Sequence, residues 1–285
     1  MRVTIIVFTL IAIGAITFFV LSEKMPAIEP IEESIVSNPK VIGTSVEGRS
    51  IDAYTYGSGK KHLVFVGGIH GGYEWNSVSL SYQFLDYLNA NPNIVPENLT
   101  VTVIPSANPD GLFRVVKKEG RFVLTDVSED KEILISGRFN AHEVDLNRNF
   151  DCEWQPKSTW QSKTVSAGTA PFSEPESIAI KNFVLENKPK AVIFWHSQSG
   201  FVYASHCENV TLPETINIMN IYSRASGYPT AKSFDSYDVT GDADGWLAKI
   251  GIPAITVELT THETIEWEKN LAGIKAILNY YGDKR

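Results

Sequence analysis

Four short apolar runs, rich in β-branched residues and separated by segments with helical spacing, constrain the fold of this chain more than any other feature. Strands this apolar, interleaved with helices, predict a mainly parallel sheet that helices cover on both faces. In such sheets ligands bind beyond the carboxyl ends of the strands, so the residues at those ends are the candidates for function. The expected strands are 62–66, 99–104, 191–195 and 253–259, and the expected helices are 74–88, 173–186 and 264–281. Ser173, with Glu176 three residues on, predicts a capping box at the start of the second helix.

The N-terminal segment is a separate element, because residues 3–21 carry no charge. At about 1.5 Å per residue in a helix, this run matches a hydrocarbon core of about 30 Å. We expect residues 1–24 to be either a transmembrane anchor with a cytoplasmic N-terminus or a signal peptide. Residues 25–44 are expected to be an extracytoplasmic linker because proline and glutamate recur in them. Residues 45–285 would then form one domain outside the cytoplasm, either membrane-anchored or secreted.

Composition narrows the classes of partner and site. The formal net charge is −8 and Lys and Arg do not cluster, which argues against a nucleic-acid partner. Cys152 and Cys207 lack the spacing of a cysteine-based metal site. Outside the cytoplasm these two thiols either pair in a disulfide or stay as buried free thiols, and both outcomes are open because a sequence does not give their separation.

A glycine-rich junction, residues 67–74 (GGIHGGYE), follows the first expected strand. Its four glycines let the backbone turn sharply, so that His70 and Glu74 lie four residues apart where the strand passes into a helix. Imidazole and carboxylate groups are donors suited to Zn²⁺. The alternative is a surface His–Glu pair without a metal.

Two more candidate residues lie at the ends of later strands. His196 directly follows the apolar run 191–195, where a third ligand would complete a catalytic zinc site with an open fourth position. Glu258 is the only charge in an apolar run, and because an unpaired carboxylate is costly in a dry core, we expect it to face a polar cleft. There it can take a proton from a metal-activated water and pass it to a leaving amine. A structural His and a Glu at a solvated strand end are the alternatives. The remaining histidines lack partners at useful spacing and are not expected to bind metal: His62, His142, His206 and His262.

A polar segment between these motifs carries two arginines, Arg138 and Arg148, together with Asn140, Asp145 and Asn147. Guanidinium groups bind carboxylates through two hydrogen bonds and also stabilise oxyanions. The segment is therefore a candidate for substrate binding. A polar loop with structural salt bridges is the competing interpretation.

In their order along the chain, these motifs resemble the zinc carboxypeptidase family of the carboxypeptidase A and B type, the funnelins. The resemblance spans residues 45–280 and implies an α/β/α sandwich around a mixed, mainly parallel sheet of about eight strands. One departure is visible: three residues separate His70 from Glu74, whereas the commonest family form has two. The other matching motifs are Asn108-Pro109-Asp110-Gly111, Asp145-x-Asn147-Arg148-Asn149, His196, Tyr237 ahead of Thr240-Gly241, and Thr256-Val257-Glu258-Leu259.

The resemblance implies a role for each residue around the metal. His70, Glu74 and His196 would bind one Zn²⁺ per chain. Glu258 would act as general base and then as general acid. Asp145 would hydrogen-bond His70 and fix its tautomer.

The resemblance also implies roles in substrate binding. Arg138 would polarise the scissile carbonyl and hold the oxyanion, while Asn147 and Arg148 would bind the terminal carboxylate. Tyr237 would close over the bound substrate. Asp244 lies where the family places the base of the side-chain pocket, and an acid there resembles the carboxypeptidase B arrangement, which favours Lys, Arg or the amine of diaminopimelate. Capping of the following helix is the alternative role for Asp244.

The leading functional hypothesis is a metallocarboxypeptidase that hydrolyses the C-terminal peptide bond of peptides, with basic C-terminal residues as the candidate preference. A close rival is an amidase or carboxypeptidase that cleaves peptidoglycan stem peptides next to diaminopimelate. A zinc deacylase for small acyl-amino acids fits less well, because the residues matching the family's carboxylate-binding positions are intact. A non-catalytic binding module on the same fold is a hypothesis of another class, and the presence of all three ligands and the base argues against it.

Overall fold

The computed structural model describes residues 38–234 and 236–283 of the chain. The expected membrane segment, residues 1–24, and residues 25–37 of the expected linker lie outside the described residues. In the part that is described, no helix combines the length and the apolar character needed to cross a membrane.

Eight strands form one mixed sheet in the order β1-β2-β4-β3-β7-β10-β8-β9. Their bounds are β1 Lys40–Thr44, β2 Ser50–Tyr56, β3 Lys61–Val66, β4 Leu99–Ile104, β7 Ala191–Ser197, β8 Val202–Ala204, β9 Thr230–Ala231 and β10 Ala254–Leu259. Strands β4, β3, β7 and β10 are parallel to one another at the centre. Strands β1 and β2 pair antiparallel at one side, and at the other β8 pairs antiparallel with β10 and parallel with β9. The fold is thus the expected mixed, mainly parallel sheet. The sheet begins at Lys40, within the range 25–44 that the sequence assigned to a linker.

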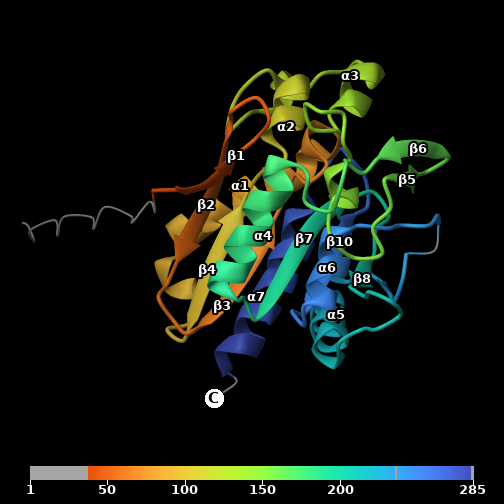
Figure 1. Cartoon of the computed structure of the whole chain (residues 1–285). Helices are drawn as coiled ribbons and strands as arrows, with labels where there is room; N and C mark the ends of the chain where they lie inside the picture. The colour runs from red at the N-terminus through yellow and green to blue at the C-terminus, as the bar shows by residue number, and fades with distance from the viewer. Residues whose placement is uncertain (1–37, 235, 284–285) are drawn as a thin grey trace, which may run out of the picture. The chain divides into compact units, whose positions relative to one another are not determined.

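Helices cover both faces of this sheet (Figure 1). Helices α1 (Trp75–Ala90), α5 (Pro213–Ser226) and α7 (Trp267–Asp283) pack on one face, and α4 (Pro175–Asn187) and α6 (Ala243–Lys249) pack on the other. Two shorter helices, α2 (Pro109–Val116) and α3 (Lys131–Ser136), and a small hairpin, β5 (Lys157–Trp160) with β6 (Lys163–Ser166), stand outside these layers. In β3, Leu63 and Phe65 point into one core and Val64 and Val66 into the other. Strand β3 is apolar along most of its length because both faces of the sheet are buried.

The predicted capping box at the start of α4 is wrong. Glu174 occupies the N-cap position without a capping hydrogen bond from its side chain. Pro175 follows in the first helical turn, where its fixed φ and missing N–H fit best. The hydroxyl of Ser173 instead donates a hydrogen bond to Glu174 Oε1 over 2.8 Å. Glu176 is buried and accepts a hydrogen bond from the backbone N–H of Val46, so it fastens the chain near β1 to this helix.

Candidate active site

The carboxyl ends of β3, β7 and β10 lie at the same edge of the sheet and border a cleft of about 900 Å³. His196 in β7 pairs in register with Glu258 in β10, so the parallel ladder itself sets these two residues side by side. Both residues line the cleft, as the position of their motifs predicted.

The glycine-rich junction after β3 brings His70 and Glu74 to this edge. Gly71 has a φ of +46°, and a Cβ at this position would lie 2.5 Å from the carbonyl oxygen of Gly137, so only glycine fits. A short 3₁₀ turn, Gly71–Glu74, follows His70 and absorbs the third residue between the two expected ligands before α1 begins at Trp75. The unusual spacing is therefore compatible with both side chains facing one point.

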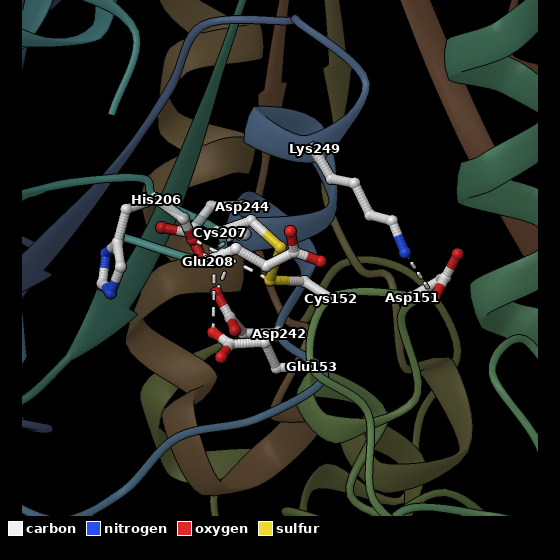
Figure 2. The surroundings of a disulfide bond; sticks show 10 residues. Asp151, Cys152, Glu153, His206, Cys207, Glu208, Asp242, Asp244 and Lys249 are labelled. Carbon is white, nitrogen blue, oxygen red and sulfur yellow. Dashed lines mark hydrogen bonds and ion pairs between the residues drawn. A yellow bond between two sulfur atoms is a disulfide. The ribbon is translucent and has the colours of Figure 1, made fainter. Parts of the chain in front are cut away.

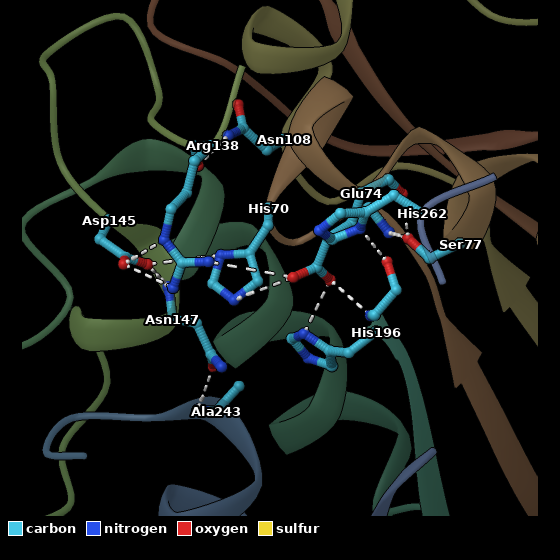
Figure 3. A network of polar contacts seen from close by, with 12 residues as sticks. His70, Glu74, Ser77, Asn108, Arg138, Asp145, Asn147, His196, Ala243 and His262 are labelled. Atoms are coloured by element: carbon cyan, nitrogen blue, oxygen red, sulfur yellow. Dashed lines mark hydrogen bonds and ion pairs between the residues drawn. The ribbon is translucent and has the colours of Figure 1, made fainter. Parts of the chain in front are cut away.

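His70, Glu74 and His196 form a buried group whose donor atoms all lie within 4.8 Å of one another. The carboxylate of Glu74 is in the middle of the group, with Oε2 3.1 Å from Nδ1 of His196 and Oε1 3.9 Å from Nε2 of His70 (Figure 3). His70 and Glu74 are only 4% and 3% exposed, which excludes the alternative of a surface pair. Two imidazoles and one carboxylate at this separation fit a single Zn²⁺.

Burial and charge set the protonation of this group. Burial, assisted by the positive charge of Arg138, holds the pKa of His70 well below its usual value and so leaves a lone pair for a metal. Burial alone would lower the pKa of His196 as well, but the neighbouring carboxylate of Glu74 outweighs it and raises that pKa. Burial, followed by the charge of Glu74, raises the pKa of Glu258 to about 7. Within the described residues, Oε2 of Glu258 is buried without a hydrogen-bond partner, as suits an acid that exchanges protons with a ligand.

Arg138 lies between the metal group and Asp145. Its Nε and Nη2 atoms are both 2.8 Å from Oδ2 of Asp145, and Nη1 lies 3.9 Å from Oε1 of Glu74 (Figure 3). The other oxygen of Asp145 is 3.5 Å from Nδ1 of His70, a near contact rather than a hydrogen bond. Asp145 therefore holds Arg138 more firmly than it holds His70.

Asn147 and Arg148 also line the cleft, and each is bonded to the protein itself. Arg148 is 2% exposed and donates from Nε and Nη2 to the carbonyl oxygen of Thr159, at 3.3 and 3.0 Å. Its Nη1 donates to the carbonyl oxygen of Asn147 over 2.6 Å. The side-chain oxygen of Asn147 accepts a hydrogen bond from the N–H of Ala243 at the start of α6.

The far end of the cleft is acidic. Asp242 caps α6 by accepting a hydrogen bond from the N–H of Gly245, while Asp244 accepts one from the hydroxyl of Thr256 at 3.0 Å. Both carboxyl groups line the cleft, and burial followed by the charge of Asp244 raises the pKa of Asp242 well above its usual value. Tyr237 lines the same cleft.

A disulfide joins Cys152 to Cys207 beside this acidic end (Figure 2). It resolves the choice between paired and free thiols that the sequence left open. It ties the segment that follows Arg148 to the segment that follows β8, and both cysteines are buried. A disulfide of this kind is typical of an oxidising compartment outside the cytoplasm.

His262 and Trp160 are among the cleft residues that went unrecognised in the sequence. His262 lines the cleft, with Nδ1 2.6 Å from the hydroxyl of Ser197 and its ring 4.7 Å from that of Tyr73. Its position, four residues after Glu258 at the end of the same strand, was the available signal. No sequence pattern indicated the position of Trp160, because it belongs to a hairpin whose strands are only four residues long.

Residues 31–276 match the family of zinc carboxypeptidases, peptidase family M14. The chain belongs to this family. The buried His–Glu–His group is the candidate site for the single zinc ion of this family. The resemblance read from the motifs is confirmed.

Similar proteins include a bacterial and a mammalian enzyme. Gamma-D-glutamyl-L-diamino acid endopeptidase 1 of Lysinibacillus sphaericus is 27% identical over 238 residues, which cover 76% of this chain and 59% of that protein. Mast cell carboxypeptidase A of Rattus norvegicus is 26% identical over 267 residues, which cover 89% of this chain and 59% of that one. This chain thus spans about three fifths of the length of these relatives.

Solved structures share the fold. The structure of thrombin activatable fibrinolysis inhibitor has a TM-score of 0.69 at 20% identity and covers 89% of this chain and 71% of its own. The structure of murein-tripeptide amidase MpaA from Escherichia coli O157 has a TM-score of 0.61 at 21% identity, covering 89% of this chain and 98% of its own. Both support an α/β fold of the carboxypeptidase A kind.

Proposed function

We propose that this chain hydrolyses an amide bond next to a residue that carries a free C-terminal carboxylate, as a zinc-dependent carboxypeptidase does. The observation that carries this proposal is the buried His70–Glu74–His196 group with Glu258 beside it, whose buried Oε2 atom has no hydrogen-bond partner. Metal-assisted hydrolysis requires a metal-binding group, an acid that exchanges protons near neutral pH and an open cleft. Here the acid is Glu258, whose pKa is raised to about 7, and the cleft lies beside it.

Each residue near the metal group has a distinct part. Zinc bound to His70, Glu74 and His196 would polarise a carbonyl and lower the pKa of a water molecule. Glu258 takes a proton from the attacking water and transfers it to the leaving amine, a task that suits an acid titrating near neutral pH. Arg138 directs its Nη1 group toward the metal site, where it stabilises negative charge on the carbonyl oxygen of the substrate.

The terminal carboxylate of the substrate binds to Arg148 and Asn147, and Tyr237 closes over it. In the described conformation, the Nε and Nη2 groups of Arg148 are bonded to the carbonyl of Thr159. A carboxylate forms its strongest hydrogen bonds with such a pair of parallel donors. The carboxylate therefore replaces a neutral carbonyl with a charged acceptor, which strengthens the hydrogen bonds of Arg148.

The acidic end of the cleft supports a substrate with an amine in its C-terminal side chain. Asp244 is the candidate partner of that amine, because it lines the cleft next to the carboxyl group of Asp242. Two carboxyl groups at close range favour a cation between them. Lysine, arginine and diaminopimelate all offer one.

A second candidate function is the cleavage of peptidoglycan stem peptides beside a diamino acid. The similarity to an endopeptidase that is named for a γ-D-glutamyl-L-diamino acid bond favours it. The disulfide agrees with a location outside the cytoplasm. Attachment to a membrane through residues 3–21 belongs to this proposal and concerns residues outside those that the structure describes.

A substrate panel tests both candidates. The zinc-loaded full chain is given peptides that end in lysine, leucine or diaminopimelate, each with a free and with an amidated C-terminus. We expect hydrolysis only of the free-carboxylate forms, with leucine the poorest substrate. Cleavage of diaminopimelate peptides alone would favour the stem-peptide function. Equal cleavage of amidated peptides would contradict the role of Arg148, and no cleavage at all would favour a binding module.

A further inference from the structure

The β5–β6 hairpin touches both arginines of the cleft through adjacent residues. The carbonyl of Thr159 accepts the two hydrogen bonds from Arg148 described above. The next residue, Trp160, places its ring against the other arginine, with Cζ of Arg138 4.6 Å from the centre of the ring. This distance is within the range of a cation–π contact.

The ring of Trp160 is itself held in place. The ring of Tyr73 packs edge-on against it at 5.1 Å and that of Phe139 at 6.1 Å. Trp160 is 4% exposed, yet it belongs to none of the main hydrophobic clusters of the described residues. Its packing therefore serves the wall of the cleft rather than the core of the sheet.

Arg138 needs two kinds of restraint to present one nitrogen to the substrate. Asp145 holds the edge of the guanidinium group that carries Nε and Nη2. Both of those contacts end on a single oxygen of Asp145, Oδ2. The guanidinium group can therefore still rotate about this oxygen and tilt its plane. A large aromatic face against the guanidinium restrains this rotation and fixes the direction of Nη1.

We propose that Trp160 is a positioning residue for Arg138, and that its ring fixes the plane in which the guanidinium group meets the carbonyl oxygen of the substrate. The inference rests on the proposed role of Arg138. Trp160 acts through Arg138 and does not take part in proton transfer. Its removal lowers turnover, while substrate binding and zinc binding stay nearly unchanged.

A double-mutant cycle tests the inference on the zinc-loaded full chain. The variants are Trp160→Leu, Arg138→Ala and their combination, measured with one peptide of the panel and with zinc content as a second readout. We expect Trp160→Leu to lower kcat about tenfold, with KM changed less than about twofold, since a small displacement of a catalytic group is costly. In the Arg138→Ala background the same change should leave kcat unaltered.

Conservative variants keep the test decisive. Trp160→Phe retains an aromatic face and should restore kcat to within about threefold of the wild type. If Trp160→Leu does not fold, Trp160→Met, which fills more of the space without an aromatic face, replaces it in the cycle. Val165→Ala is the matched control, because Val165 is buried in the same hairpin without a contact to Arg138.

The outcomes separate the inference from the proposed function. An equal loss of kcat from Trp160→Leu in both backgrounds, or a change confined to KM, would overturn the inference. A loss of similar size in Val165→Ala would also overturn it, since any weakening of the hairpin would then suffice. An Arg138→Ala variant with unaltered kcat would instead remove Arg138 from the mechanism.

Discussion

At the edge of the sheet, His196 and Glu258 are neighbours in paired strands. In the loop wall of the cleft, Arg148 and Asp244 are held by hydrogen bonds of their side chains instead. The loop wall here means residues 138–172, 205–212, 227–234 and 236–244. Backbone register fixes the sheet edge, and side-chain hydrogen bonds, aromatic contacts and one disulfide fix the wall.

This difference separates two kinds of function. Groups on rigid strand ends keep the separation that metal binding and proton transfer need. Groups in the wall depend on contacts that a ligand can exchange, as the carbonyl of Thr159 on Arg148 illustrates. Changes at the sheet edge should therefore alter turnover. Changes in the wall should alter affinity and preference, except at Arg138 and Trp160, which act on the carbonyl oxygen of the substrate.

The largest effect is expected from Glu258→Gln. This change keeps the shape of the side chain and removes the base, so kcat should fall on the order of 10²- to 10⁴-fold while zinc content stays the same. Steady-state kinetics and metal analysis of the purified variant measure both quantities. Wild-type turnover would remove Glu258 from the mechanism and break the distinction between edge and wall.

The next effect concerns preference, through Asp244→Asn. Loss of the negative charge should lower kcat/KM for peptides ending in lysine or diaminopimelate on the order of 30-fold, because the amine loses a half-buried charged partner. Peptides ending in leucine should change little. Asp151→Asn is the matched control, since Asp151 loses the same charge but pairs with Lys249 on the surface. A uniform loss on all peptides would mean that Asp244 only stabilises α6.

Removal of the disulfide should have a smaller effect on activity than on stability. A cross-link between residues 55 positions apart in the sequence contributes about 4 kcal/mol in the chain-entropy account. The double variant Cys152→Ser with Cys207→Ser should therefore unfold at a lower temperature and show a raised KM, with zinc content and kcat nearly unchanged. A large loss of kcat without a change in KM would show that the wall and the edge are not separable.

The smallest effect is a pH dependence in the metal-free protein. The pKa of Glu258 is raised from 4.5 to about 7 in the folded state, so folding favours its protonated form. This contribution is fully present below the unfolded pKa and is lost as pH rises through about 7. Chemical unfolding of chelator-treated protein should therefore show that the wild type loses stability relative to Glu258→Gln between about pH 5 and about pH 8. A constant difference over that range would contradict the burial of an unpaired carboxylate.

The same comparison explains what the sequence could predict. The central strands and the candidates His70, Glu74, His196 and Glu258 were found because apolar runs define strands and parallel strands end at one edge. Trp160 was missed, since its contact with Arg138 depends on how two loops fold over each other. The expected hydrogen bond from His70 to Asp145 is not formed, because the carboxylate of Asp145 pairs with Arg138 instead.

The central claim is that His70, Glu74 and His196 together hold one zinc ion, and metal analysis of single variants tests it most directly. The wild type and the control His142→Ala, whose histidine lies outside the metal group, should each bind one zinc ion per chain with high affinity. His196→Ala should lose both the metal and the activity. Stoichiometric zinc retained in His196→Ala, or lost equally in His142→Ala, would contradict the account.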